Sequence, residues 1–275
     1  MYFRRPRGSG LAAAVVPLLL AGCSPSAAPA PEAPAAEPQA VAAPPPAPIP
    51  APPPPLGRAE LLDAVALAAD AAAAGRPYPE PNAALAGRSF RLKLPFGCFG
   101  EPAADAQLRY EWNPQTRSLK LSAAPVSWTD VPQVRQLVGD ASTEVLEGFW
   151  VRRPWLRTGD CPAPPPPPPD PAGPPPAAAP ETLGLVSIFG AEDSRVQQRT
   201  RRPYEITRKL KDGEAPSSNG YRLVLEGRIG GSETEPPVVC RPDGPDRPPT
   251  CFVRIGLDRV AFETPAGEQL AEWAS

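Results

Sequence analysis

Proline limits what this chain can fold into more than any other residue. Of the 46 prolines, 26 lie in two tracts, 14 within residues 24–55 and 12 within residues 162–180. Proline has no backbone N–H to donate and fixes its own φ, so neither tract can form a helix or a sheet. Both tracts are expected to be disordered spacers of the polyproline II type. A folded body is therefore expected over residues 57–275, with a proline-rich insertion at residues 162–181.

The first 25 residues have the pattern of an export signal. Three arginines within the first seven residues precede an apolar run over residues 11–20, which is too short to span a bilayer, since a spanning helix needs about 20 residues. The run ends in Leu-Ala-Gly-Cys, with the cysteine at Cys23. This sequence resembles the lipobox of bacterial lipoproteins. An ordinary secretory signal is the alternative, and Arg4-Arg5 alone is a weak indication of twin-arginine export.

The resemblance to bacterial lipoproteins implies a specific modification. Residues 1–22 would be removed, Cys23 would carry a diacylglyceryl group on its thiol, and its freed amine would carry a further acyl chain such as palmitate. Two or more chains attach a protein stably to a membrane. Residues 23–56 would then be a tether, which reaches roughly 100 Å when fully extended. Ser24 stands where an aspartate favours the inner membrane in that class, so the outer membrane is expected.

Four cysteines remain once Cys23 is acylated, and an even number in an exported protein indicates disulfides. Three pairings are possible. We favour Cys98–Cys161 and Cys240–Cys251, because the second pair brackets a loop rich in Pro, Asp and Gly with apolar residues on both sides, as in a hairpin closed at its base. A redox or metal–thiolate site is the alternative, but the chain has no Cys-x-x-Cys spacing.

The pattern of apolar residues predicts one helix and then strands. Leu61, Leu62, Val65, Ala69 and Ala72 share one face of a helix expected at residues 58–74, and Gly75 follows as a stop. Beyond it, apolar and polar residues alternate with period two, in runs that contain Phe90, Leu92, Leu94; Leu108, Tyr110, Trp112; Leu119, Leu121; Tyr221, Leu223, Leu225; Val253, Ile255; Val260, Phe262; and Leu270, Trp273. This pattern predicts a mainly β protein, an antiparallel β-sandwich or barrel-like body with one N-terminal Ala-rich helix.

The second proline tract leaves two organisations open. It separates two small β domains, or it is an insertion in one body. Strand-like runs on its two sides, residues 149–151 and 183–189, are able to pair across it, and a long loop adds little entropic cost. We favour one body.

Histidine is absent from the chain, which excludes Ser-His-Asp and Cys-His catalysis and histidine metal ligation. No cofactor is expected. Removal of residues 1–22 takes away three arginines and lowers the formal net charge from −2 to −5. An acidic body argues against a nucleic-acid partner.

Three groups of residues are candidates for function, each with a structural alternative. Four tryptophans are candidates for sugar stacking or for lining an apolar cavity, or belong to the core: Trp112, Trp128, Trp150 and Trp155. A basic run is a candidate for contact with lipid headgroups, or is a solvated strand edge: Arg195, Arg199, Arg201, Arg202, Arg208, Lys209 and Lys211. Two acidic pairs are candidates for glycoside hydrolysis, or are surface charges: Glu144 with Glu147, and Glu192 with Asp193. A Ser-Lys dyad also stays open.

Together these features predict a lipid-anchored protein of the cell envelope, without enzymatic activity, whose β body binds or scaffolds an envelope glycan, lipid or protein. The first alternative is a periplasmic lipid or lipoprotein carrier with an apolar cavity lined by the tryptophans. The second alternative is a carboxylate-based hydrolase of cell-wall glycans.

Overall fold

The computed structural model describes residues 52–78, 80–164, 166, 180–193, 197–200, 202–232 and 234–274. Cys23, the signal segment and most of both proline tracts lie outside these residues. Ala51–Ser275 form one compact unit. None of the helices in the described ranges is long and apolar enough to cross a bilayer.

The described chain is mainly β, as predicted. Its helices are α1 (Arg58–Ala73), α2 (Glu80–Ala83) and α3 (Pro132–Val138). Its strands are β1 (Ser89–Phe96), β2 (Leu108–Asn113), β3 (Ser118–Ala123), β4 (Val126–Ser127), β5 (Thr143–Trp150), β6 (Leu183–Gly190), β7 (Tyr204–Lys209), β8 (Tyr221–Ile229), β9 (Val238–Arg241), β10 (Thr250–Glu263) and β11 (Gln269–Ala274). The two short helices, α2 and α3, were not predicted.

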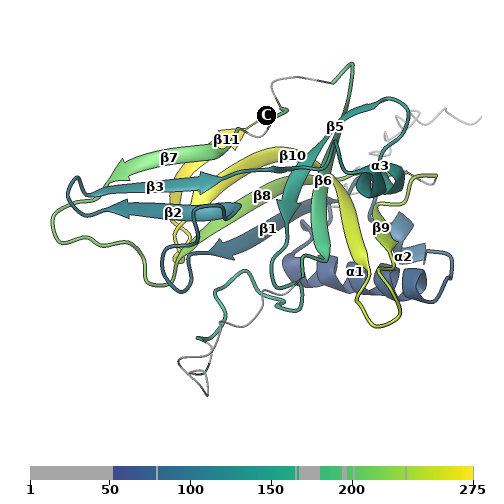
Figure 1. Ribbon diagram of the computed structural model, residues 1–275, viewed down its shortest axis with the longest axis horizontal. Coiled ribbons are helices and arrows are strands. Elements are labelled where there is room, and N and C mark those ends of the chain that lie inside the picture. The colour runs from purple at the N-terminus through teal and green to yellow at the C-terminus, as the bar shows by residue number, and fades with distance from the viewer. Residues whose placement is uncertain are drawn as a thin grey trace, which may run out of the picture. The chain divides into compact units, whose positions relative to one another are not determined.

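The strands form an eight-stranded and a three-stranded sheet (Figure 1). The larger sheet has the order β1-β8-β10-β6-β5-β4, with β9 and β11 also paired to β10. Its long strand β10 pairs with β6 and β9 in its first half and with β8 and β11 in its second half. The pairing is mostly antiparallel, as expected, but β6 and β10 run parallel. A parallel pair needs a long crossover connection, which no local sequence pattern reveals.

The smaller sheet, β2-β3-β7, is antiparallel and lies over β1 and β8 in Figure 1. Aromatic side chains join the two sheets: the Tyr110 and Tyr221 ring centroids are 5.5 Å apart, and those of Tyr204 and Trp273 are 5.3 Å apart. The main hydrophobic core lies between the sheets and continues to α1. A second cluster, which includes Trp128, covers the other face of β5 and β6 beneath α3.

Strand β10 is continuous through a β-bulge. Along this strand the inward positions change from odd numbers, as at Val253 and Ile255, to even numbers, as at Val260. The pairing with β8 explains the change, because Leu257 and Arg259 oppose consecutive residues of β8 and Asp258 is the extra residue. One inserted residue exchanges the two faces of a strand, so both halves bury their apolar side chains.

Helix α1 begins and ends close to where the sequence predicts. The Gly57 N–H donates to Glu60 (2.9 Å) at its start, and Gly75 takes a left-handed conformation (φ 62°) just past its end. Its buried face includes Ala68 and Ala71, while the predicted Ala69 and Ala72 are only partly buried.

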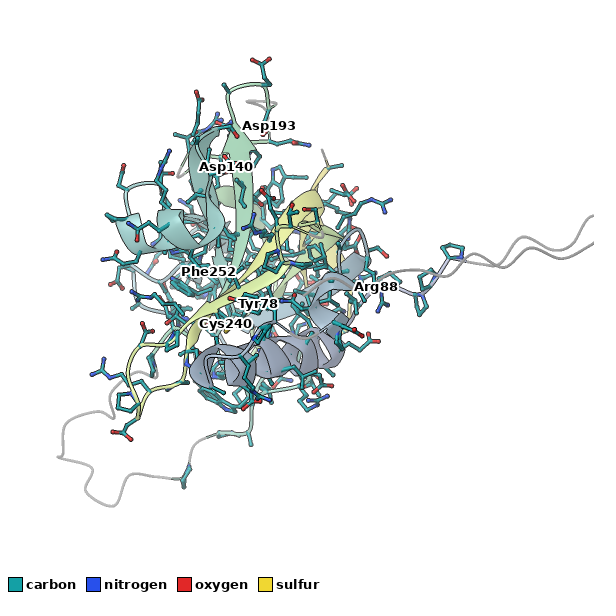
Figure 2. All side chains as sticks on the ribbon, turned by 90° about the vertical axis from the view of Figure 1, so that its right-hand side faces the viewer. Tyr78, Arg88, Asp140, Asp193, Cys240 and Phe252 are labelled. Carbon is teal, nitrogen blue, oxygen red and sulfur yellow. A yellow bond between two sulfur atoms is a disulfide. The ribbon has the colours of Figure 1, made fainter. Side chains whose placement is uncertain are left out.

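Residues that follow α1 close the outer edge of β9. The Asn82 side chain exchanges two hydrogen bonds with the backbone of Val238, and the Tyr78 hydroxyl accepts from the Cys240 N–H at 3.0 Å (Figure 2). A sheet edge with unpaired N–H and C=O groups promotes association between chains. These two side chains satisfy that edge from within the body.

Both disulfides join the predicted partners, Cys98 with Cys161 and Cys240 with Cys251. Cys240 and Cys251 lie directly opposite each other on β9 and β10. Two disulfides are typical of proteins outside the cytoplasm. The strands on either side of the second proline tract, β5 and β6, pair with each other, so strands from both sides of that tract share one sheet.

Candidate functional site

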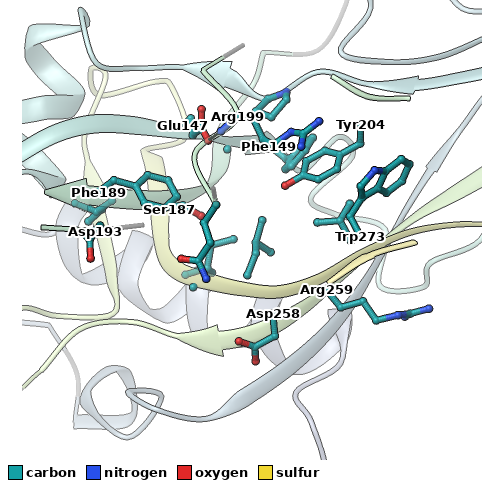
Figure 3. A pocket seen from close by; sticks show the side chains of 18 of the residues that line it. Glu147, Phe149, Ser187, Phe189, Asp193, Arg199, Tyr204, Asp258, Arg259 and Trp273 are labelled. Atoms are coloured by element: carbon teal, nitrogen blue, oxygen red, sulfur yellow. Dashed lines mark hydrogen bonds between the residues drawn. The ribbon is translucent and has the colours of Figure 1, made fainter. Parts of the chain in front are cut away.

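A cavity at the junction of the two sheets is the candidate site, which we call the inter-sheet pocket. It has a volume of about 540 Å³, within the range of about 300–1,000 Å³ typical of small-molecule sites. Strands β5, β6, β10 and β11 of the large sheet line it together with β7, Gln197 and Arg199 (Figure 3). Its walls are mixed, with aromatic side chains from Phe149, Phe189, Tyr204 and Trp273 and also charged side chains.

Glu147 holds one wall of the pocket in place. It is buried on β5, and its two carboxylate oxygens accept the backbone N–H groups of Arg199 (2.6 Å) and Thr200 (2.9 Å). Thr200 has a positive φ of 51°, which is costly for a β-branched residue. The carboxylate therefore fixes a strained turn beside the pocket.

Arg199 and Tyr204 form the next part of the wall. The Arg199 guanidinium lies over the Tyr204 ring, 4.4 Å from its centroid, and donates to the carbonyl oxygen of Pro203 at 2.9 Å. Burial raises the pKa of the Tyr204 hydroxyl; the Arg199 charge acts against this rise and the Glu147 charge adds to it. The hydroxyl therefore stays protonated at neutral pH and is able to donate a hydrogen bond.

Ser187 lies directly opposite Glu147 in the β5–β6 pairing and faces the same side of the sheet. Its side chain is only 6% exposed, and its hydroxyl oxygen has no hydrogen-bond partner. A buried hydroxyl without a partner costs about 1–3 kcal/mol. This oxygen has almost no accessible surface, so a ligand with a polar atom would contact it only after the Ser187 side chain rotates toward the pocket.

The tryptophans predicted as a functional group do not share one site. Trp128 and Trp150 pack edge to face (5.1 Å between centroids) and line a separate cavity of about 360 Å³ near α3. Trp112 is partly buried against the main core, and Trp155 is exposed. The tryptophan of the inter-sheet pocket is Trp273, which was predicted only as a strand residue.

The basic run is divided by the fold. Arg199 stacks on Tyr204, Arg202 donates to the Arg199 carbonyl oxygen at 3.1 Å, and Arg208 lies 4.0 Å from Glu268. Lys209 and Lys211 are exposed. Two further members, Arg195 and Arg201, lie outside the described residues.

The acidic pairs are also separated. Glu147 and Asp193 both line the inter-sheet pocket, whereas Glu144 and Glu192 are exposed. Asp193 accepts the Gly190 N–H at 2.6 Å in a turn. Both Glu147 and Asp193 thus have structural partners. In the described part of the chain, no group of three or more Asp, Glu, His or Cys residues comes together in a way that could hold a metal ion.

Comparison with known proteins gives no match: no protein-family model, no curated protein and no solved structure matches this chain. The candidate site therefore has to be judged from its own geometry.

Sequence reasoning identified Glu147 and Asp193 of this site but missed Ser187, Tyr204 and Trp273. Each of these three fits a strand pattern and nothing more. Arg199 was also named, as part of the basic run. Because the pocket draws its residues from strands that are far apart in the sequence, including β6, β7 and β11, no local motif marks it.

Proposed function

We propose that this chain is a lipid-anchored protein of the cell envelope whose β body binds a small, largely apolar molecule in the inter-sheet pocket. The lipobox-like sequence at Cys23 supports the anchor, and its position before Ser24 favours the outer membrane. The two disulfides support an oxidising compartment.

One observation carries the binding proposal. A pocket of about 540 Å³ has four aromatic walls and aliphatic side chains, and one polar group, the Ser187 hydroxyl, has no partner within the protein. Binding sites for small molecules are mostly apolar and have a few placed polar groups that fix orientation. The ligand that fits best is an apolar or aromatic body with one hydrogen-bonding group.

Native mass spectrometry of the protein purified from membranes tests this proposal. We expect an additional mass that is lost on denaturation and recovered in an organic extract. Trp273→Ala removes an aromatic wall and Ser187→Ala removes the buried hydroxyl, so both should reduce occupancy. Trp112→Ala is the matched control, because Trp112 packs against the main core but does not line the pocket.

A protein without bound small molecule, and with equal behaviour of the three variants, would contradict the pocket assignment. The body would then act as a scaffold for a macromolecule, which crosslinking in the native envelope would capture.

A further inference from the structure

A tryptophan stands at the apex of a tight turn on the surface. The Leu156 N–H donates to the Arg153 carbonyl oxygen at 2.9 Å, which places Pro154 and Trp155 at the two central positions of a β-turn. Proline is favoured at the first of these positions. The Trp155 side chain is 67% exposed, the largest exposed fraction among the big apolar side chains of the described residues.

A buried arginine holds this turn in place. Arg58, at the start of α1, is only 7% exposed, and its guanidinium donates to the carbonyl oxygens of Leu156 (2.6 Å), Arg152 (2.9 Å) and Arg153 (3.0 Å). Its Nη1 atom has no partner. Burial, with a contribution from Arg153, lowers the pKa of Arg58 to about 10. Burial of a guanidinium without a carboxylate is costly, and the three hydrogen bonds to backbone carbonyl oxygens offset part of this cost while they hold the turn in place.

Arg152 and Arg153 lie beside a second exposed aromatic ring. The Arg153 guanidinium carbon is 5.9 Å from the centroid of Phe99, which is 53% exposed. Both arginines line a hollow of about 190 Å³ together with Phe99 and Glu101. Among the described residues no carboxylate comes within ion-pair distance of either arginine, whereas neighbouring Arg157 pairs with Asp63 at 2.5 Å. Burial raises the pKa of Glu181 and the Arg152 charge acts against this rise, so Arg152 has an acidic neighbour beyond ion-pair distance. Neither guanidinium is held in a close ion pair, and both are able to bind an external anion.

We propose that Phe99, Arg152, Arg153 and Trp155 form a docking surface for an anionic lipid bilayer. Tryptophan suits the membrane–water interface because its ring is apolar and its indole N–H is polar, and a phenylalanine ring adds apolar contact at the same depth. Arginines near an anionic leaflet attract its headgroups, with about fivefold in binding for each basic residue. The inference rests on the proposed function for its setting, since an acyl anchor keeps the body at high effective concentration near the bilayer.

Lipid quenching of tryptophan fluorescence tests the docking surface. The full chain is reconstituted in vesicles that contain phosphatidylglycerol, with plain or brominated acyl chains, and in phosphatidylcholine vesicles. We expect brominated lipid to quench an emission component that Trp155→Ser removes, with stronger quenching on the anionic vesicles. Arg152→Glu with Arg153→Glu should lower the ratio of docked to undocked protein by at least about 25-fold.

Lys209→Glu with Lys211→Glu is the matched control, because it makes the same change of charge at two exposed lysines of the basic run. It should leave the quenching unchanged. Intact mass of the same sample reports acylation, and an unacylated chain is tested by co-sedimentation with the same vesicles, so loss of the anchor is distinguished from loss of docking.

Equal emission in plain and brominated vesicles would overturn the proposal, as would an equal loss in the lysine control. An emission change on addition of a proline-rich peptide, without any response to vesicles, would also overturn it. Trp155 also lines an apolar groove beside α1, together with Pro154, Pro248 and Pro249. That result would assign Trp155 to peptide binding in this groove.

Discussion

Asn82→Ala probes how the edge of β9 is closed. The Asn82 side chain is 2% exposed; its Nδ2 donates to the Val238 carbonyl oxygen (2.7 Å), and its Oδ1 accepts the Val238 N–H (2.9 Å). Alanine removes both bonds and leaves two buried backbone groups unpaired. Each such group costs about 1–3 kcal/mol, so the free energy of unfolding should fall by about 2–6 kcal/mol. This is a large part of the roughly 5–15 kcal/mol typical of a domain.

Urea unfolding followed by tryptophan fluorescence measures this change as a lower midpoint with an unaltered slope. Asn113→Ala is the matched control, because exposed Asn113 accepts one bond, from the Thr116 N–H at 2.9 Å, and its loss should cost about 1 kcal/mol or less. Asn82→Asp keeps the acceptor but loses the donor and should fall between the two. If Asn82→Ala destabilises no more than Asn113→Ala, the edge is not held in the way described.

Three further predictions concern stability. Cys161→Ser should lower the free energy of unfolding by about 4 kcal/mol and Cys251→Ser by about 3 kcal/mol, because the two disulfides span 63 and 11 residues. Denaturant melts that show the reverse order would contradict the loop-entropy argument. Burial raises the pKa of Tyr204, so this tyrosine ionises at lower pH in the unfolded chain, and the free energy of unfolding should fall as pH rises above about 10. Tyr204→Phe should make the free energy of unfolding, measured by urea melts at several pH values, depend less on pH. An equal pH dependence in both proteins would refute the assignment. Gly148→Ala would place a Cβ 1.9 Å from the Leu185 carbonyl oxygen, so thermal unfolding should show a loss of about 2 kcal/mol or more, and an unchanged melt would show that β5 and β6 are farther apart.

Alternation of apolar and polar residues predicted most strands because each strand of this body buries one face. The same pattern was harder to interpret in β10. Val253 and Ile255 were assigned to one run and Val260 and Phe262 to another, because the inward position changes from odd to even. That change of phase is the signature of the bulge at Asp258, and it was visible in the sequence.

The cysteine pairs were predictable for a related reason. Cys240 and Cys251 flank a turn-rich loop, so antiparallel pairing brings them together without knowledge of any distant segment. Helix α3 was missed because it is short: Pro132 suits a helix start, but Val134 and Val138 cover a single turn of the apolar pattern.

The inter-sheet pocket depends on contacts between segments that are far apart in the chain. Tyr204 meets Trp273 across the two sheets, and Glu147 holds the turn at Thr200. A strand pattern states which face a residue occupies but not which other strand it faces. The candidate site was therefore beyond local sequence reasoning, although two of its acids were named.

Intact-mass analysis of the native protein, extracted from membranes, tests the central claim most directly. The account predicts a chain that begins at Cys23, carries diacylglyceryl and acyl groups, and has four hydrogen atoms fewer than the reduced chain because both disulfides are formed. A mature chain that still begins at Met1, with an unmodified Cys23, would contradict it.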